Sequence, residues 1–359
     1  MFEGLRRRLV QRGDAVVYLR WMLAGFAVSV LATRAYLAAT GYPQVGGGGL
    51  HISHALWGGL LLFVAALLPL VLSGRRVSRV AAVLAGVGAG LFIDEVGKLI
   101  TQDNDYFFPA AAPIVYAVFL LAVLAYVQVR SGRKRSARDE LHRAFGDLGA
   151  MLDGDLDQKG KDDLDRRLRV AAGDKDAPPH LHRLAGLLQD YVPDVAVSEP
   201  GRLRRWGRRL SDLAGRVFTR PRLRVLLIAG LALSGAAALA DLAAVAYVLL
   251  DSWDGRTGSL TARLQRVAGI DLKGSGGVVL VLVRALLDGV AGALLLFAAF
   301  LLFARDAGLA LAQYSLLFMV CVVDLLVFYS EQFAAATSAI VEFTLLVGVR
   351  RYRGGGGGG

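Results

Sequence analysis

The amino-acid sequence predicts an all-α fold, a polytopic transmembrane helical bundle of about eight spans with a helical insert. Hydrophobic residues make up 55% of the 359 residues. Apolar runs of roughly 20 residues recur along the chain, which is the length that a helix needs to cross a bilayer. The only cysteine, Cys321, lies in such a run. The chain therefore lacks the residues for a disulfide framework or a Cys-based zinc site.

The distribution of basic residues predicts the orientation of the spans. Hydropathy places the spans, to within a few residues, at 16–40, 50–73, 79–101, 109–130, 222–250, 277–304, 307–329 and 332–349. Arginine and lysine precede the first span, follow the last, and otherwise gather in every second connection, so all of these clusters fall on one side. Under the positive-inside rule this side is cytoplasmic. We therefore expect a multi-pass protein of the cell inner (plasma) membrane with both termini in the cytoplasm.

The formal net charge of +11 does not indicate nucleic-acid binding here, because the arginines lie beside apolar spans. The expected partner is the lipid bilayer, with no nucleic acid, and a homo-oligomer is left open.

Four segments follow from this pattern: a first four-span repeat at 1–130, a cytoplasmic helical insert at 131–221, a second four-span repeat at 222–353, and a flexible glycine tail at 354–359. Within the insert, Pro178 and Pro179 predict the start of a helix. Residues 201–218 place apolar side chains at helical spacing opposite arginines. This spacing predicts an amphipathic helix on anionic inner-leaflet lipids, with packing against neighbouring helices as the alternative.

An internal duplication is predicted from four matches in the same order. Gly58 and Gly292 begin similar runs, GGLLLFVAALL and GALLLFAAFLL, and Ser29 and Ser234 begin another similar pair. Asp94 and Asp324 each precede a glutamine by eight residues, and Ile114-Val-Tyr corresponds to Ile340-Val-Glu. Because four spans preserve orientation, the two repeats would be parallel.

Ionisable residues inside or beside the spans are the candidate functional residues, because a charge in the bilayer is costly unless it is paired or hydrated. The candidate ligand or proton site comprises His51, His54, Asp94, Glu95, Lys98, Arg34 and Asp324. At about 1.5 Å per residue, His54 lies roughly 6 Å and Asp94 roughly 10 Å below the outer boundary. The outer ends of spans two and three can therefore bring histidines and carboxylates together. Asp94 and Lys98, four residues apart, are expected to share a helix face.

Three interpretations of this cluster remain open. His51, His54, Asp94 and Glu95 are a possible ligand set for a divalent metal such as zinc, since two histidines on one face plus carboxylates suit such ions. The same groups could handle protons or an anion. They could also be structural, with the histidines capping a helix and Asp94 paired with Lys98. Asp103 and Asp105 in the next loop are either hard-cation ligands or turn formers.

Three stretches of the chain, HISHALWGG, IDEVGKLIT and DNDYFFP, resemble an uncharacterised group of bacterial multi-pass membrane proteins. The resemblance covers mainly the first four spans and implies no function.

The leading hypothesis is a transporter or channel for a cation or small charged solute, with an extracytoplasmic His/carboxylate site. One alternative is a membrane-embedded metal-dependent hydrolase or transferase acting on lipid headgroups. Known zinc hydrolases of this kind use more histidines than this chain offers. The other alternative is a non-catalytic scaffold or sensor whose insert recruits a partner.

Overall fold

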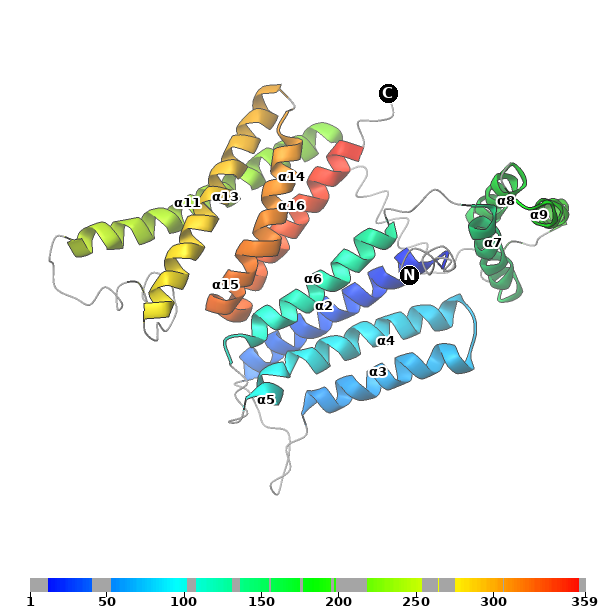
Figure 1. The fold of residues 1–359 in the computed structure, drawn as a ribbon, viewed down its shortest axis with the longest axis horizontal. Helices are drawn as coiled ribbons and strands as arrows, with labels where there is room; N and C mark the ends of the chain where they lie inside the picture. Colours follow the sequence, from blue (N-terminus) through cyan, green and yellow to red (C-terminus); the bar gives the residue numbers. More distant parts are fainter. Residues whose placement is uncertain are drawn as a thin grey trace, which may run out of the picture. The chain divides into compact units, whose positions relative to one another are not determined.

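A computed structural model describes residues 12–40, 53–101, 108–130, 136–154, 156–174, 177–194, 197, 218–253, 264, 275–305 and 307–354. Every regular element in this part of the chain is helical (Figure 1). Seven helices are long and apolar enough to cross a membrane, as expected of a polytopic membrane protein. They are Ala15–Thr40, His54–Val71, Arg75–Asp94, Ala111–Arg130, Arg220–Asp251, Gly277–Ala304 and Leu309–Glu331.

The chain forms two compact units. The first comprises residues 1–95 and 118–208, and the second comprises residues 96–117 and 209–359, so that the division falls inside helix α6 (Ala111–Arg130). The first unit contains α2 (Ala15–Thr40), α3 (His54–Val71) and α4 (Arg75–Asp94). In it α4 lies between α2 and α3 and packs along both (Figure 1).

Glycines on two faces of α4 permit this close packing. A Cβ atom on Gly86 would lie 2.0 Å from the main-chain oxygen of Met22, and one on Gly90 would lie 2.1 Å from Oγ of Ser29. A Cβ atom on Gly88 would lie 2.8 Å from the main-chain oxygen of Gly58 in α3. Small residues let transmembrane helices approach closely. Gly86, Gly90 and Asp94 are four residues apart, so Asp94 continues the face of α4 that meets α2.

The insert is a small bundle of three helices, α7 (Ala137–Leu152), α8 (Gln158–Ala172) and α9 (Pro179–Tyr191), followed by a 3-10 turn, η1 (Val192–Asp194). Leu141, Leu164 and Leu168 lie in its core. Ser136 and Asp139 form a capping box at the start of α7. Pro179 is the first residue of α9, which confirms the predicted helix start. The predicted amphipathic helix at 201–218 lies outside the described residues, apart from Phe218.

The second unit contains α5 (Val96–Ile100), α11 (Arg220–Trp253), α13 (Ser275–Arg305) and α14 (Leu309–Phe318). A π-helical turn, η2 (Met319–Val323), joins α14 to α15 (Asp324–Glu331). The 3-10 turn η3 (Gln332–Ala335) then leads into α16 (Ala336–Gly354), which returns beside α14 (Figure 1).

The helix α16 contains most of the segment predicted as the eighth span, 332–349, but it is not among the seven apolar helices. The helix pairings of the two halves also differ. In the first half the first span, α2, packs on the third, α4. In the second half the fifth span, α11, packs on the sixth, α13. The duplication therefore stays a prediction.

Candidate functional site

An ion pair between Arg34 on α2 and Asp94 at the end of α4 forms the centre of the candidate site. Nε of Arg34 lies 2.7 Å from Oδ1 of Asp94, and Nη2 donates to the main-chain oxygen of Asp94 at 3.1 Å. That carbonyl belongs to the last turn of α4, where carbonyl groups lack partners within the helix. The Asp94 side chain is fully buried and that of Arg34 is 9% exposed. Arg34 therefore neutralises the carboxylate and also caps the helix.

His54, the first residue of α3, joins the same cluster from the other side of α4. Its Nδ1 lies 2.6 Å from Oε2 of Glu95, and its Nε2 lies 3.3 Å from Oδ2 of Asp94. Ser53 caps α3 by accepting a hydrogen bond from the Ala55 N–H, which fixes the backbone beside the imidazole. Because Gly58 follows His54 by four residues and contacts α4, His54 is on the face of α3 that meets α4.

The cluster can hold a proton on the imidazole ring. Each ring nitrogen of His54 lies within ion-pair distance of a carboxylate oxygen, and a nearby carboxylate favours the protonated, charged form of the ring. In that state the guanidinium and the imidazolium balance the two carboxylates, which are buried among apolar helices. The His54 side chain is 24% exposed, whereas that of Glu95 is 1% exposed. His54 is therefore the member through which the cluster can exchange protons or meet a solute.

The geometry gives less support to metal binding than to proton handling. Among the described residues, no group of three or more His, Cys, Asp or Glu side chains is placed to hold a metal ion. Both nitrogens of His54 face carboxylate oxygens, so a metal ion would have to replace these contacts. His51, Asp103 and Asp105 lie outside the described residues, and the ligand set that includes His51 stays a prediction.

The single continuous helix that was expected to carry both Asp94 and Lys98 is interrupted between them, and their pairing stays a prediction. The helix α4 ends at Asp94, and Glu95 leaves the helical conformation with ψ of 3° before α5 begins at Val96. The i, i+4 relationship holds only within a continuous helix. Arg34 and His54 are partners of Asp94 that the helical spacing did not indicate.

Asp324, the candidate in the second unit, lies in a different setting. Asp324 is 1% exposed, and its carboxyl group contacts the hydroxyl of Tyr116 on α6. It also lies close enough to Glu342 on α16 to interact electrostatically. Tyr116 was not a candidate from the sequence. The repeat alignment that pairs Tyr116 with Glu342 was the available signal, since both residues lie beside Asp324.

Arg284 and two acids on α11 and α13 are further ionisable groups in this unit's spans. Arg284 pairs with Glu331 and donates to Ser330 Oγ at 2.7 Å. Asp288 is buried, four residues before Gly292, which contacts α11 closely. Asp288 and Asp241 on α11 are near enough to interact electrostatically.

A charged network links the insert to the ends of α2 and α4 within the first unit. Nε of Arg75 lies 2.8 Å from Oδ2 of Asp14, and Arg75 also pairs with Asp147 on α7. Nη1 of Arg167 on α8 lies 3.3 Å from Asp147. Burial raises the pKa of Asp147 above its ordinary value, although Arg167 and Arg75 act in the opposite direction. Asp147 thus joins two insert helices to the start of α4.

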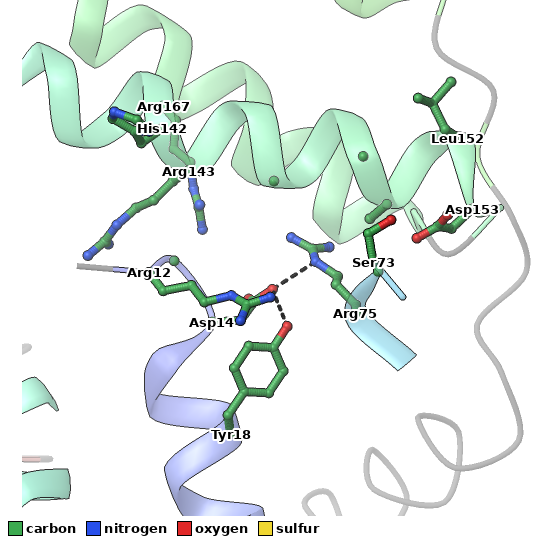
Figure 2. A pocket seen from close by; sticks show the side chains of 15 residues that line it. Arg12, Asp14, Tyr18, Ser73, Arg75, His142, Arg143, Leu152, Asp153 and Arg167 are labelled. Atoms are coloured by element: carbon green, nitrogen blue, oxygen red, sulfur yellow. Dashed lines mark hydrogen bonds and ion pairs between the residues drawn. The ribbon is translucent and has the colours of Figure 1, made fainter. Parts of the chain in front are cut away.

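A cavity of about 560 Å³ lies beside this network (Figure 2). Its lining includes Arg12, Tyr18, His142, Arg143 and Asp153. Arg12 is held in place because its Nη2 donates to Ser78 Oγ at 2.7 Å and its guanidinium lies over the Tyr18 ring. Basic and acidic groups are mixed along the wall, so we interpret the cavity as part of the contact between the insert and the spans.

Comparisons of the chain with protein-family models, curated proteins and solved structures found no match.

Proposed function

We propose that this protein is a transporter or channel for a cation or a small charged solute, with a binding site at Arg34, His54, Asp94 and Glu95. The observation that carries the proposal is a set of two buried carboxylates, one buried arginine and one partly exposed histidine inside apolar helices. Ionisable groups at such positions are costly and characteristically mark ion or proton pathways. Because histidine titrates near neutral pH, His54 can couple solute binding to a proton gradient.

The proposed topology has eight spans, with α16 as the eighth, and both termini and the insert in the cytoplasm of an inner-membrane protein. The arginine clusters support this orientation, and Arg351 and Arg353 in the last turn of α16 belong to them. On this topology His54 and Asp94 lie near the extracytoplasmic surface. The two four-span repeats and contact of 201–218 with anionic lipids belong to the same proposal.

The direct test is tracer uptake into liposomes that contain the purified protein. Na⁺, Mn²⁺ and Zn²⁺ would be offered separately, with and without a pH gradient. We expect one of them to accumulate with the wild-type protein and the uptake to fall at least tenfold in His54→Ala and Asp94→Asn. Leu56→Ala is the matched control, since Leu56 is 67% exposed on the same turn of α3. Equal uptake by both site variants and the control would rule out the proposed site.

A non-catalytic sensor is the second candidate, and the contact of Asp147 with Arg75 and Arg167 favours it. This contact could transmit a change in the spans to the insert. A sensor requires the insert and tolerates loss of His54, whereas a transporter requires His54. Comparing Arg75→Gln with His54→Ala for capture of a cytoplasmic partner and for uptake separates the two functions.

A further inference from the structure

The second unit contains an acid pair that the site around Asp94 does not include. Asp324 is the first residue of α15 and Glu342 lies on α16, and their side chains are 1% and 5% exposed. The two carboxyl groups lie close enough to interact electrostatically. Two ionised carboxylates so close together and away from water repel each other, and a proton on one of them removes this repulsion. The pair thus favours a bound proton.

The π-helical turn before Asp324 adds a third group to the pair. The N–H of Asp324 bonds to the main-chain oxygen of Met319, five residues earlier. The hydroxyl of Tyr116 lies 2.9 Å from the main-chain oxygen of Val320 and 3.0 Å from Oδ2 of Asp324. Stacking on Phe328, with ring centroids 4.4 Å apart, holds the tyrosine ring in this position. Single π-helical turns inside α-helices occur frequently at functional sites.

Counting donors indicates that the pair can hold a second proton. A phenol has one hydrogen, and the carbonyl of Val320 can only accept it. If Tyr116 donates to Val320, the contact with Asp324 requires a proton on the carboxyl group of Asp324. Glu342 then holds the other proton. With one proton fewer, Tyr116 shares its hydrogen between Val320 and Asp324, and the Glu342 proton remains.

An independent observation comes from the second oxygen of Glu342. Oε2 is buried and has no hydrogen-bond partner among the described residues. An ionised carboxylate with such an oxygen would leave charge in an apolar interior, at a cost far above that of a neutral acid. The neutral, protonated form of Glu342 fits this environment.

The surrounding charges do not replace the proton. Asp288 on α13 is near enough for its negative charge to repel charge on both carboxyl groups. Cys321 of η2 is also close to Asp324. Arg284 on α13 pairs with Glu331, and its field reaches Asp288 and Asp241. Tyr116 from α6 supplies only its hydroxyl group.

We infer that Asp324 and Glu342, together with Tyr116, form a proton-binding site in which the two acids hold one or two protons at neutral pH. Occupancy by one or two protons changes the hydrogen bonds of η2, α15, α16 and α6 together. Use of this site to couple transport to a proton gradient rests on the proposed function, but proton binding itself does not.

Infrared spectroscopy of the purified full-length chain in lipid nanodiscs tests the inference without any transport measurement. A protonated carboxyl group gives a C=O stretching band that is separate from the carboxylate bands and shifts in D₂O. At pH 7 we expect this band in the wild-type spectrum and its loss in the Asp324→Asn/Glu342→Gln double variant. Glu331→Gln is the matched control, because Glu331 is 36% exposed and paired with Arg284. The control should keep the band.

Identical wild-type and double-variant spectra in this region would overturn the inference. If circular dichroism shows that the double variant is misfolded, Tyr116→Phe provides the test, since it keeps the ring that stacks on Phe328 and removes one hydrogen bond to Asp324. We expect the band to shift in Tyr116→Phe, and an unchanged band would also overturn the inference. Tracer uptake by the same variants separately reports whether the site serves transport.

Discussion

Arg34 and Asp94 form a buried ion pair in which the guanidinium contacts both the side chain and the main-chain oxygen of Asp94. The pair joins α2 to the last turn of α4, next to His54 and Glu95. It therefore contributes to helix packing as well as to the charge balance of the proposed site.

Removing one member of this pair should destabilise the first unit. Arg34→Met or Asp94→Leu alone leaves an uncompensated buried charge, which costs about 3–5 kcal/mol. The Arg34→Met/Asp94→Leu double variant should lose less than the sum of the single losses. A double-mutant cycle from unfolding in detergent micelles, followed by circular dichroism, measures the coupling. Additive losses would show that the two side chains do not interact.

Close packing of α4 on α2 predicts a contrast between two glycines. Alanine at Gly86 would place its Cβ 2.0 Å from the main-chain oxygen of Met22, so the helices must separate. We expect a loss of about 1–3 kcal/mol, as for other overpacking substitutions. The same change at Gly59, where a Cβ meets nothing within 4 Å, should gain about 0.5–1 kcal/mol from helix propensity. Thermal unfolding of both variants checks the contrast, and equal effects would contradict the packing.

Contact of the insert with the spans should depend on Arg75. Arg75→Gln removes the charge that faces both Asp14 and Asp147, so the peptide of α7 around Asp147 should exchange its amide hydrogens faster. Arg166→Gln is the control, since Arg166 is 68% exposed and its pair with Asp163 is a surface pair within α8. Hydrogen exchange followed by mass spectrometry measures both. Unchanged exchange in Arg75→Gln would indicate that the insert is held by other contacts.

The raised pKa of Asp147 predicts a pH dependence of stability. Because the folded chain holds this proton more tightly than the unfolded chain does, stability is highest below the ordinary pKa of 3.8. It then falls as the pH rises from that value through the raised pKa of the folded state. Asp147→Asn should remove this part of the fall, which thermal unfolding of both proteins across the acidic range would reveal. Parallel pH profiles would contradict the assignment.

The sequence predicted the meeting of His54 with Asp94 and Glu95, because hydropathy placed these residues at neighbouring ends of two consecutive spans. It did not reveal how they pair. Helical spacing offered Lys98 as one possible partner of Asp94, but the helix is interrupted at Glu95, between the two residues. A hydropathy profile does not represent such a break, since Asp94 and Glu95 lie within one predicted span.

The contacts of Asp324 were harder to predict from the sequence than those of Asp94. Tyr116 is 208 residues away from Asp324 along the chain and lies in an apolar run, where a tyrosine has no distinctive pattern. The π-helical turn also has no composition of its own, since Met319–Val323 reads as ordinary span. The alignment of the two halves was the one sequence signal that related Tyr116 to Glu342.

The central claim, that His54 lies between Asp94 and Glu95, is tested most directly by nitrogen NMR of the histidine side chains. The chain has five histidines, and His54→Gln assigns the signal of interest. We predict two protonated ring nitrogens for His54 at neutral pH, with shifts that change in both Asp94→Asn and Glu95→Gln but not in Leu56→Ala. A His54 signal that is the same in both carboxylate variants as in the wild type would contradict the account.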